Sequence, residues 1–141
     1  MHKKISNSTL FQLIEAGHMA RQVLLRPLNK FRLQPGDDAI LLGSKKKKLT
    51  TDVQLGQLTG LASHSLQIRI DRLVDLSLIH RASFEESMEP ATRLSKAGRA
   101  VRKQLIAHWV ELDEALMNDL SKMEKKQLRQ TMKRFTRLLS L

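Results

Sequence analysis

Cysteine is absent from the 141-residue chain, and aromatic residues are scarce. Without cysteine the protein has no disulfide, no thiolate zinc site and no thiol redox switch. Aromatic residues make up 4% of the chain, as four Phe, one Trp and no Tyr. The core is therefore expected to consist mainly of Leu, Ile, Val, Met and Ala, a mixture that suits packed helices.

Long apolar runs are also missing. No stretch approaches the roughly 20 apolar residues of a membrane-spanning helix. Near the start of the chain, Gln12, Glu15 and His18 interrupt the apolar residues that follow Lys3 and Lys4, unlike the core of a signal peptide. We therefore expect a cytoplasmic protein with no membrane partner.

Signals for catalysis or for a metal are weak. The chain has no cysteine nucleophile, no glycine-rich phosphate loop and no paired-carboxylate motif, so we predict no enzyme, no catalytic residue and no cofactor. His18, His80 and His108 are spread along the sequence, and only Glu111 follows one of them at helical spacing. Two ligands at that spacing are more often surface neighbours, and we predict no metal site.

Positive charge is in excess. Twenty-five Lys and Arg against 14 Asp and Glu give a formal net charge of +11. Such a protein is attracted to polyanions, of which nucleic acid is the first candidate and an anionic membrane surface the second. Charge alone does not define a function, because it attracts any polyanion. A specific function also requires a structural element that recognises one ligand.

The first third of the chain predicts two helices. Apolar residues recur at three- and four-residue steps over residues 8–32, which is typical of an amphipathic helix, here with a bend near Pro27. A short helix over 35–43 is predicted to begin at Pro35, with Asp37 and Asp38 at the positive end of its dipole. The lysine run 45–48 that follows indicates an exposed loop.

Two further helices and a hairpin are predicted next. Thr51 and Gln54 have the spacing of a capping box, opening a helix that ends near Gly60. Ser63 is a candidate cap for the following helix. These helices are predicted to bury the following apolar side chains: Val53, Leu55, Leu58 and Leu61 in the first, and Leu66, Ile70, Leu73 and Val74 in the second. Extended stretches near 78–82 and 91–94 flank a polar run and indicate a two-stranded hairpin.

The last third predicts two amphipathic helices. One begins near Ser95 and carries Leu105, Trp109, Leu112 and Leu116 at the steps of a coiled-coil seam. Ser121 and Glu124 form a second capping box, which opens the other. Together the elements predict a mainly α fold, in which residues 51–94 have the order of a winged helix-turn-helix with a small β-hairpin wing.

The second helix of such a pair enters the DNA major groove, which is about 12 Å wide and accepts one helix. It must therefore anchor one face in the core and expose hydrogen-bonding side chains near its N-terminal end. Gln pairs with adenine and Arg with guanine through two hydrogen bonds each. Residues of this type at the start of the predicted helix are Ser63, His64, Ser65, Gln67 and Arg69.

Three stretches carry a resemblance to a known family: LQPGDDAILL, TTDVQLGQLTGLASHSLQIRIDRLVDLSLIHR and RLSKAGRAV. Over residues 33–102 the chain resembles the multiple antibiotic resistance regulator (MarR) family of bacterial transcription factors. The resemblance implies a DNA-binding domain over 33–94, between long dimerisation helices over 8–32 and 95–141.

The resemblance also implies a site for each partner. DNA contacts are expected at Ser63, His64, Ser65, Gln67, Arg69 and Arg72, with further positive charge from Lys46, Lys47, Arg81 and Arg93. A small anionic or aromatic effector is expected beside His18, Arg21, Leu41 and Trp109, in a crevice to which Gly17 and Ile40 would contribute. The interface of a homodimer is expected at Leu10, Ile14, Leu112, Leu116, Met132, Phe135 and Leu138.

Two positions depart from the family pattern. The wing usually carries an Asp-x-Arg pair, and here Glu86 and Met88 occupy those positions, so the arginine is missing. Arg81, Arg93 or the lysine run is the candidate replacement. The family also favours Gly at the end of the reading helix, where Ser77 stands. A left-handed backbone there would cost a non-glycine residue about 1 kcal/mol.

The sequence thus predicts a dimeric repressor of transcription that binds a pseudo-palindromic double-stranded DNA site and is released by a small-molecule effector. Two other classes stay open. A basic architectural or RNA-binding protein would bind nucleic acid without sequence choice. A helical interaction protein would bind another protein and no DNA.

Overall fold

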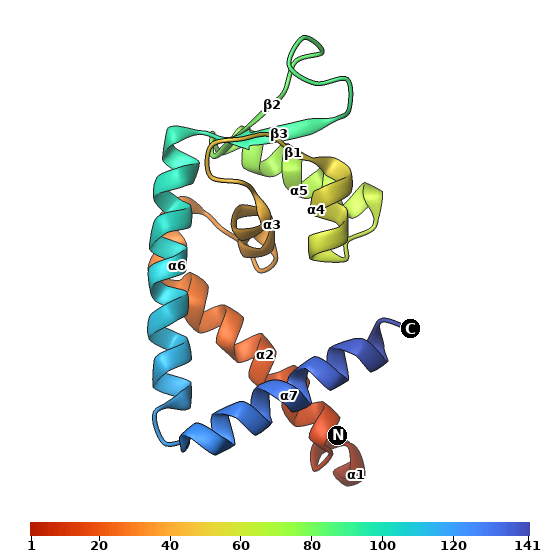
Figure 1. Ribbon diagram of the computed structural model, residues 1–141, viewed down its shortest axis with the longest axis vertical. Helices are drawn as coiled ribbons and strands as arrows, with labels where there is room; N and C mark the ends of the chain where they lie inside the picture. Colours follow the sequence, from red (N-terminus) through yellow and green to blue (C-terminus); the bar gives the residue numbers. More distant parts are fainter. The chain divides into compact units, whose positions relative to one another are not determined.

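The computed structural model describes all 141 residues and is mainly α-helical, as predicted (Figure 1). Helices and strands follow in the order α1 (Lys3–Ser6), α2 (Thr9–Leu25), the 3-10 helix η1 (Arg26–Phe31), α3 (Asp37–Gly43), β1 (Thr50–Thr51), α4 (Asp52–Thr59), α5 (Ser63–Asp75), β2 (Ile79–Arg81), β3 (Ala91–Leu94), α6 (Lys96–Met117) and α7 (Lys122–Leu139). None of these helices is long and apolar enough to cross a membrane.

The chain divides into two compact units, Met1–Trp109 and Val110–Leu141. The core of the first unit is aliphatic, as the scarcity of aromatic residues predicts, and its fully buried side chains include Leu28, Ile40, Leu41, Leu55, Ile70, Leu73, Ile79, Leu94, Val101 and Leu105. The second unit holds the end of α6 and all of α7, and none of its residues is fully buried. Its apolar side chains are therefore at most partly buried.

A small antiparallel sheet closes one side of the first unit. The predicted hairpin is confirmed as β2 and β3, which pair Ile79 with Leu94 and Arg81 with Thr92. A third strand, β1, was not predicted, and it pairs with β3 to give the order β1, β3, β2. With only two residues it has no alternating pattern to detect. Figure 1 shows the connection between β2 and β3 projecting beyond the sheet as a wing.

The structure corrects four local predictions. The first long helix ends at Leu25 and continues as η1, because Pro27 has no N–H to donate to a regular helix. Helix α3 begins at Asp37 rather than at Pro35, after Gly36 in a left-handed conformation. Ser63 is the first residue of α5 and does not cap it, since the N-cap is Ala62 and makes no side-chain cap. Of the four side chains expected to bury on the helix after Thr51, only Leu55 does so, whereas Val53 and Leu58 are exposed.

Both predicted capping boxes are confirmed. Thr51 and Gln54 exchange hydrogen bonds of 3.0 and 3.1 Å at the start of α4. Ser121 and Glu124 do the same at the start of α7, with two hydrogen bonds of 3.1 Å. Ser77 has a left-handed backbone with φ 60°, so a non-glycine residue there does carry the cost of about 1 kcal/mol.

A close backbone approach explains the glycine of the Leu-Ser-Lys-Ala-Gly stretch. A Cβ atom on Gly98 would lie 1.9 Å from the Leu78 carbonyl oxygen. Ser95 holds this crossing from both sides, since its Oγ donates to the Ser77 carbonyl at 2.7 Å and accepts from the Gly98 N–H at 2.9 Å. The start of α6 is thereby fixed against the end of α5.

Candidate nucleic-acid interface

Helices α4 and α5 form the two-helix arrangement that the sequence predicts. Helix α4 ends at Thr59 and is capped by Gly60, whose φ of 69° allows a tight turn before α5 begins at Ser63. Buried Leu66, Ile70 and Leu73 follow one another at four and three residues and anchor one face of α5. Helix α5 contacts β2, α3 and α4. These contacts hold the helix in place and leave its opposite face available to a ligand.

The N-terminal end of α5 is open to solvent. Ser63, His64 and Ser65 are all exposed, and Ile68 is exposed one turn further on. These residues combine hydroxyl, imidazole and apolar groups. The set offers hydrogen bonds to base edges and apolar contact to a thymine methyl group, which are the means of direct readout in the major groove.

Gln67 lies in a network with its neighbours rather than projecting freely. Its Nε2 donates to Asp52 Oδ2 at 2.6 Å, and its Oε1 accepts from Arg81 at 2.9 Å. Arg81 also pairs with Asp71 at 2.6 Å. Contacts between Gln67 or Arg81 and DNA would therefore compete with hydrogen bonds within the protein.

Arg69 and Arg72 converge on one carboxylate. Asp37 at the start of α3 is fully buried, and it pairs with both arginines, with 3.2 Å between Arg69 Nη1 and Asp37 Oδ1. Arg72 also donates to the Arg32 carbonyl at 3.0 Å. The two guanidinium groups hold α5 against α3, a role that the sequence did not predict for them.

The turn before α3 is shaped to receive these arginines. A Cβ atom on Gly36 would lie 2.7 Å from the Arg69 guanidinium carbon, so only glycine fits there without movement. Asp37 accepts from the Gln34 N–H at 2.7 Å, and buried Asp38 pairs with Arg21 at 3.1 Å. Two adjacent aspartates that the sequence assigned to the helix dipole are thus the buried partners of three arginines.

The wing, residues 82–90, is acidic and apolar. It contains three glutamates and no Lys or Arg. Glu86 accepts from the Ser83 N–H at 2.9 Å and pairs with Arg93 at 2.6 Å. Phe84 and Met88 are about nine-tenths exposed. The two arginines proposed as replacements for the family's wing arginine, Arg81 on β2 and Arg93 on β3, are therefore already paired with carboxylates.

The loop before β1 carries four lysines that, unlike Arg81 and Arg93, form no ion pair with a carboxylate. The side chains of Lys45, Lys46, Lys47 and Lys48 are all exposed, as predicted. The Lys45 N–H donates to Thr50 Oγ1 at 2.9 Å, which ties the base of the loop to the sheet.

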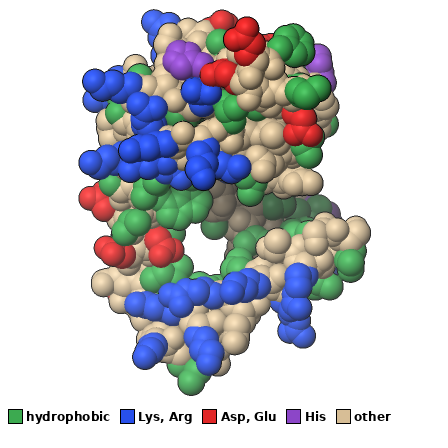
Figure 2. All heavy atoms as spheres, turned by 45° about the horizontal axis from the view of Figure 1, so that its top comes forward, with side chains coloured by type: hydrophobic (Ala, Val, Ile, Leu, Met, Phe, Trp, Pro, Cys, Tyr) green, Lys and Arg blue, Asp and Glu red, His purple; other side chains and the backbone are tan.

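On the face shown in Figure 2, Lys and Arg side chains gather in rows rather than spreading evenly. Such rows suit the regularly spaced phosphates of a nucleic acid.

A pocket of about 400 Å³ lies between α2, the turn before α3 and α5. Its lining includes three residues that the sequence assigned to an effector crevice, Gly17, His18 and Arg21, together with Gly36 and Arg69. Two other assigned residues, Leu41 and Ile40, are fully buried in the core. Trp109 is about half exposed and does not line this pocket.

Most side chains assigned to a dimer interface are exposed on the single chain. Leu10, Ile14, Leu116 and Leu138 are each about three-fifths exposed. Leu112, Met132 and Phe135 are half-buried. Further exposed apolar side chains lie on the same helices: Met19, Val23, Ile106, Trp109, Val110, Met123 and Leu139. So many exposed apolar side chains on three helices are typical of a surface that a partner covers.

The chain is a winged helix-turn-helix protein: α4 and α5 are the paired helices, and β2 and β3 frame the wing. Its fold as a whole is the one found in regulators of the MarR family, so the predicted resemblance is confirmed at the level of the fold. No model of a protein family matches the sequence, and no curated protein matches it either.

Solved structures cover nearly the whole chain. BpsR of Bordetella bronchiseptica, whose DNA binding is regulated by 6-hydroxynicotinic acid, is 13% identical with a TM-score of 0.75, over 96% of this chain and 97% of BpsR. A MarR family regulator of Silicibacter pomeroyi is 16% identical with a TM-score of 0.76, over 96% and 97%. A probable transcriptional regulator of Pseudomonas aeruginosa is 25% identical with a TM-score of 0.72, over 92% and 98%.

Proposed function

We propose that the protein is a transcriptional regulator that binds double-stranded DNA as a homodimer, with α5 of each subunit in a major groove. The observation that carries the proposal is the exposed N-terminal end of α5, on a helix whose other face is anchored by Leu66, Ile70 and Leu73. The net charge of +11 supplies attraction to phosphates, and the solved structures of the same fold include several regulators.

Base reading is assigned first to Ser63, His64 and Ser65, because these side chains are exposed and make no ion pair. Gln67, Arg69, Arg72, Arg81 and Arg93 are assigned a supporting role, since each is engaged with a carboxylate of the same chain. Lys46 and Lys47 are assigned to phosphates. Phosphate contacts position the protein on the duplex, whereas base contacts choose the sequence.

The exposed apolar side chains of α2, α6 and α7 support the proposal of a dimer. Two subunits related by a twofold axis would read a pseudo-palindromic site with half-sites about one helical turn, 10 to 10.5 base pairs, apart. Binding of both halves together raises the affinity far above that of one half. A dimer bound over a promoter would exclude polymerase and so repress transcription.

The test is selection from a pool of random duplexes on the purified protein at about 150 mM salt, close to physiological ionic strength. We expect enrichment of one inverted repeat. Uniform retention would overturn sequence-specific reading in favour of an architectural protein. No retention would overturn DNA binding and direct the search to a protein partner.

A variant sharpens this test. The double substitution His64→Ala and Ser65→Ala removes two exposed side chains without disturbing an ion pair of the core. We expect it to lose most of the preference for the selected site while keeping its affinity for random duplex, since base contacts carry the preference. A control with Phe84→Ala in the wing should keep the preference.

Release by an effector is a second part of the proposal. Arg21, Arg69 and His18 line the pocket of about 400 Å³, within the size range of small-molecule sites. Guanidinium groups recognise carboxylates through paired hydrogen bonds. A small aromatic carboxylate bound there would compete with Asp37 for Arg69 and so loosen the contact between α5 and α3. Binding energy is then coupled to the position of the reading helix.

The coupling is tested by measuring affinity for the selected site in the presence of benzoate, salicylate or 6-hydroxynicotinate. We expect at least one of these aromatic carboxylates to weaken DNA binding by about 5- to 150-fold, the usual range of allosteric coupling. Arg21→Gln should abolish the response, while Arg26→Gln, an exposed arginine outside the pocket, should leave it intact. An unchanged response in Arg21→Gln would contradict this assignment of the pocket.

A further inference from the structure

Helix α7 carries more than half of the protein's net positive charge. Its 18 residues contain seven Lys and Arg and a single acid, Glu124, so the helix contributes +6 of the chain's +11. This charge lies outside α5, the wing and the lysine loop. The contacts proposed for DNA reading therefore do not account for it.

Five of these cations form a stripe along one side of the helix. Lys122, Lys126, Arg129, Lys133 and Arg137 follow one another at steps of four, three, four and four residues. At 3.6 residues per turn they fall within an arc of about 80° over a length of about 22 Å. All five are exposed, and Glu124 lies on the other side of the helix.

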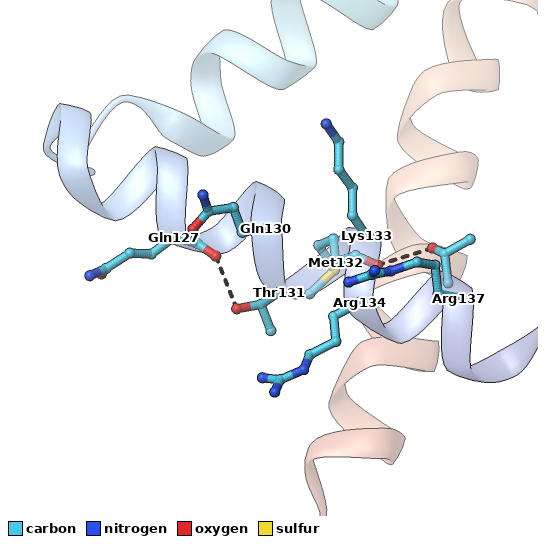
Figure 3. A pocket seen from close by; sticks show the side chains of 8 residues that line it. Gln127, Gln130, Thr131, Met132, Lys133, Arg134 and Arg137 are labelled. Atoms are coloured by element: carbon cyan, nitrogen blue, oxygen red, sulfur yellow. Dashed lines mark hydrogen bonds between the residues drawn. The ribbon is translucent and has the colours of Figure 1, made fainter.

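Most side chains around the stripe are polar and exposed to solvent. The C-terminal part of α7 presents a wide surface hollow lined by Gln127, Gln130, Thr131, Lys133, Arg134 and Arg137, with Met132 and Thr136. Figure 3 shows Lys133 and Arg134 leaving the helix in different directions, which widens the basic surface beyond the stripe. Thr131 and Thr136 bond back to carbonyls of the helix and add no charge.

A stripe of this kind is unfavourable for an isolated helix. Like charges three and four residues apart repel one another and destabilise the helix that carries them. An anionic ligand relieves the repulsion. Since the five groups lie on a nearly straight line, they match an anion whose charges are also arranged in a line, and duplex DNA has about one charge per 1.7 Å of axis.

We propose that the α7 stripe is a second duplex-binding surface, one that takes the phosphate backbone of DNA without reading its sequence. Lysine and arginine ends on an exposed stripe contact phosphates and carry no preference for base pairs. An anionic membrane is the other charged surface of this size. It is disfavoured because apolar side chains of α7 that would have to enter the bilayer, Met132, Phe135 and Leu138, are the ones assigned to the dimer interface.

The test compares three full-length proteins on a random-sequence duplex over a range of salt concentrations. The α7 variant carries Lys122→Gln, Lys126→Gln, Arg129→Gln and Lys133→Gln. The control carries Lys3→Gln, Lys4→Gln, Arg26→Gln and Lys103→Gln, four exposed cations of the same types elsewhere in the chain. Both variants have the same net charge, so a difference between them reports position rather than total charge.

We expect the α7 variant to lose salt dependence. Each phosphate contact contributes about 0.9 to the slope of log affinity against log salt, so four lost contacts reduce the slope by up to about 3.6. The control should change the slope by less than about one contact's worth, 0.9. Equal slopes for the variant and the control would overturn the proposal.

Two further arms separate this proposal from its alternatives. A charge-preserving variant with Lys122→Arg, Lys126→Arg and Lys133→Arg should keep the wild-type slope, whereas a loss there would indicate damage to α7 and contradict a purely electrostatic role. Cosedimentation with vesicles of phosphatidylcholine and phosphatidylserine tests the membrane. Vesicle binding that is lost in the glutamine variant, with an unchanged DNA slope, would overturn the proposal in favour of a lipid surface.

The outcome is independent of base reading by α5. The double variant His64→Ala and Ser65→Ala should lose its preferred site and still show the slope difference caused by the α7 substitutions. If instead the wild-type protein selects no sequence but the slope difference remains, the proposed reading of α5 fails and the α7 surface stands.

Discussion

Glycine at position 98 illustrates how one residue fixes the geometry of the winged helix-turn-helix. Its missing side chain lets the first turn of α6 approach the Leu78 carbonyl, while Ser95 bonds to both sides of the crossing. The Leu-Ser-Lys-Ala-Gly stretch is therefore explained by packing between α6 and the end of α5. A side chain at this position would have to push two backbone segments apart.

Gly98→Ala is expected to destabilise the protein by about 1 to 3 kcal/mol, the usual cost of overpacking a tight site. Gly17→Ala is the matched control, since a Cβ there meets nothing within 4 Å and alanine is the better helix former. It should raise the free energy of unfolding by about 0.5 to 1 kcal/mol. Urea unfolding followed by circular dichroism measures both, and equal effects of the two substitutions would contradict the close approach.

Asp37 is a second residue on which the arrangement depends. Its carboxylate is fully buried and compensates two arginines of α5 at once. Removing one partner of a buried ion pair leaves the other charge without compensation, which is costlier than the pair itself is favourable. Loss of the Asp37 carboxylate on α3 would therefore also weaken the attachment of α5, the helix proposed to read DNA.

We expect Asp37→Ala to lower the free energy of unfolding by about 3 to 5 kcal/mol. Asp71→Ala removes an aspartate that also pairs with an arginine of the site but is two-thirds exposed, and it should cost no more than about 1 kcal/mol. Chemical denaturation of the two variants gives the comparison. A small effect of Asp37→Ala would mean that Arg69 and Arg72 are held by other contacts.

At the scale of elements, the sequence predicts best what is local. Each capping box depends on two residues three positions apart, and both are confirmed. The hairpin and the main helices are likewise set by short-range patterns. The pairs Arg69 with Asp37 and Arg72 with Asp37 join residues 32 and 35 positions apart, and no spacing rule indicates them.

The same limit applies to the candidate site. Hydrogen-bonding character placed Ser63, His64 and Ser65 at the start of a helix, and the structure leaves them exposed there. It also selected Gln67 and Arg69, and the family resemblance added Arg72, because an arginine that reads guanine and an arginine that holds a buried carboxylate have the same side chain. Only the fold shows which arginines already have partners. The exposed Val53 and Leu58 are a similar case, since apolar character does not reveal which face of a short helix is covered.

The capping box of α7 makes this helix sensitive to acid. Two hydrogen bonds lower the pKa of Glu124 from its ordinary value of 4.5. The larger effect comes from the Ser121 N–H, which donates to the Glu124 carboxylate, and the smaller one from the hydrogen bond with the Ser121 side chain. A lowered pKa in the folded state means that the contribution to stability is present above the ordinary value. It is lost as pH falls through the lowered pKa.

We therefore expect the helical content of the wild-type protein to fall more between about pH 5 and about pH 3 than that of Glu124→Gln. Glutamine keeps the hydrogen-bonding shape of the capping box but does not titrate in this range. Circular dichroism of the two proteins across this range measures the difference, which isolates Glu124 from the other carboxylates. Identical acid transitions would show that the box does not stabilise α7.

At the scale of the whole molecule, the exposed apolar side chains of α2, α6 and α7 are the main unsatisfied feature of the single chain. The unit Val110–Leu141 buries none of its residues completely. A unit with so little core needs a partner to cover its apolar surface. In the homodimer that we propose, a second copy of the chain would be this partner and would also supply the second reading helix that a palindromic site requires.

Ile14→Glu combined with Leu116→Glu is expected to convert the dimer to a monomer, because each charge would enter an apolar interface without a partner. Both side chains are mostly exposed on the single chain, so the substitutions do not disturb its core. Val53→Glu, at an exposed apolar residue of α4, is the control and should leave the dimer intact. Light scattering gives the mass of each variant, and a double variant that stays dimeric would show that the interface lies elsewhere.

We propose that two α5 helices, held by a twofold dimer, read two half-sites together. The most direct measurement is the affinity of the protein for its selected site before and after insertion of five base pairs between the half-sites. Such an insertion turns one half-site by about half a helical turn, away from its reading helix. We expect the affinity to fall to the level of a random duplex. An affinity unchanged by the insertion would contradict the proposal, because the two half-sites would then be bound independently or not read at all.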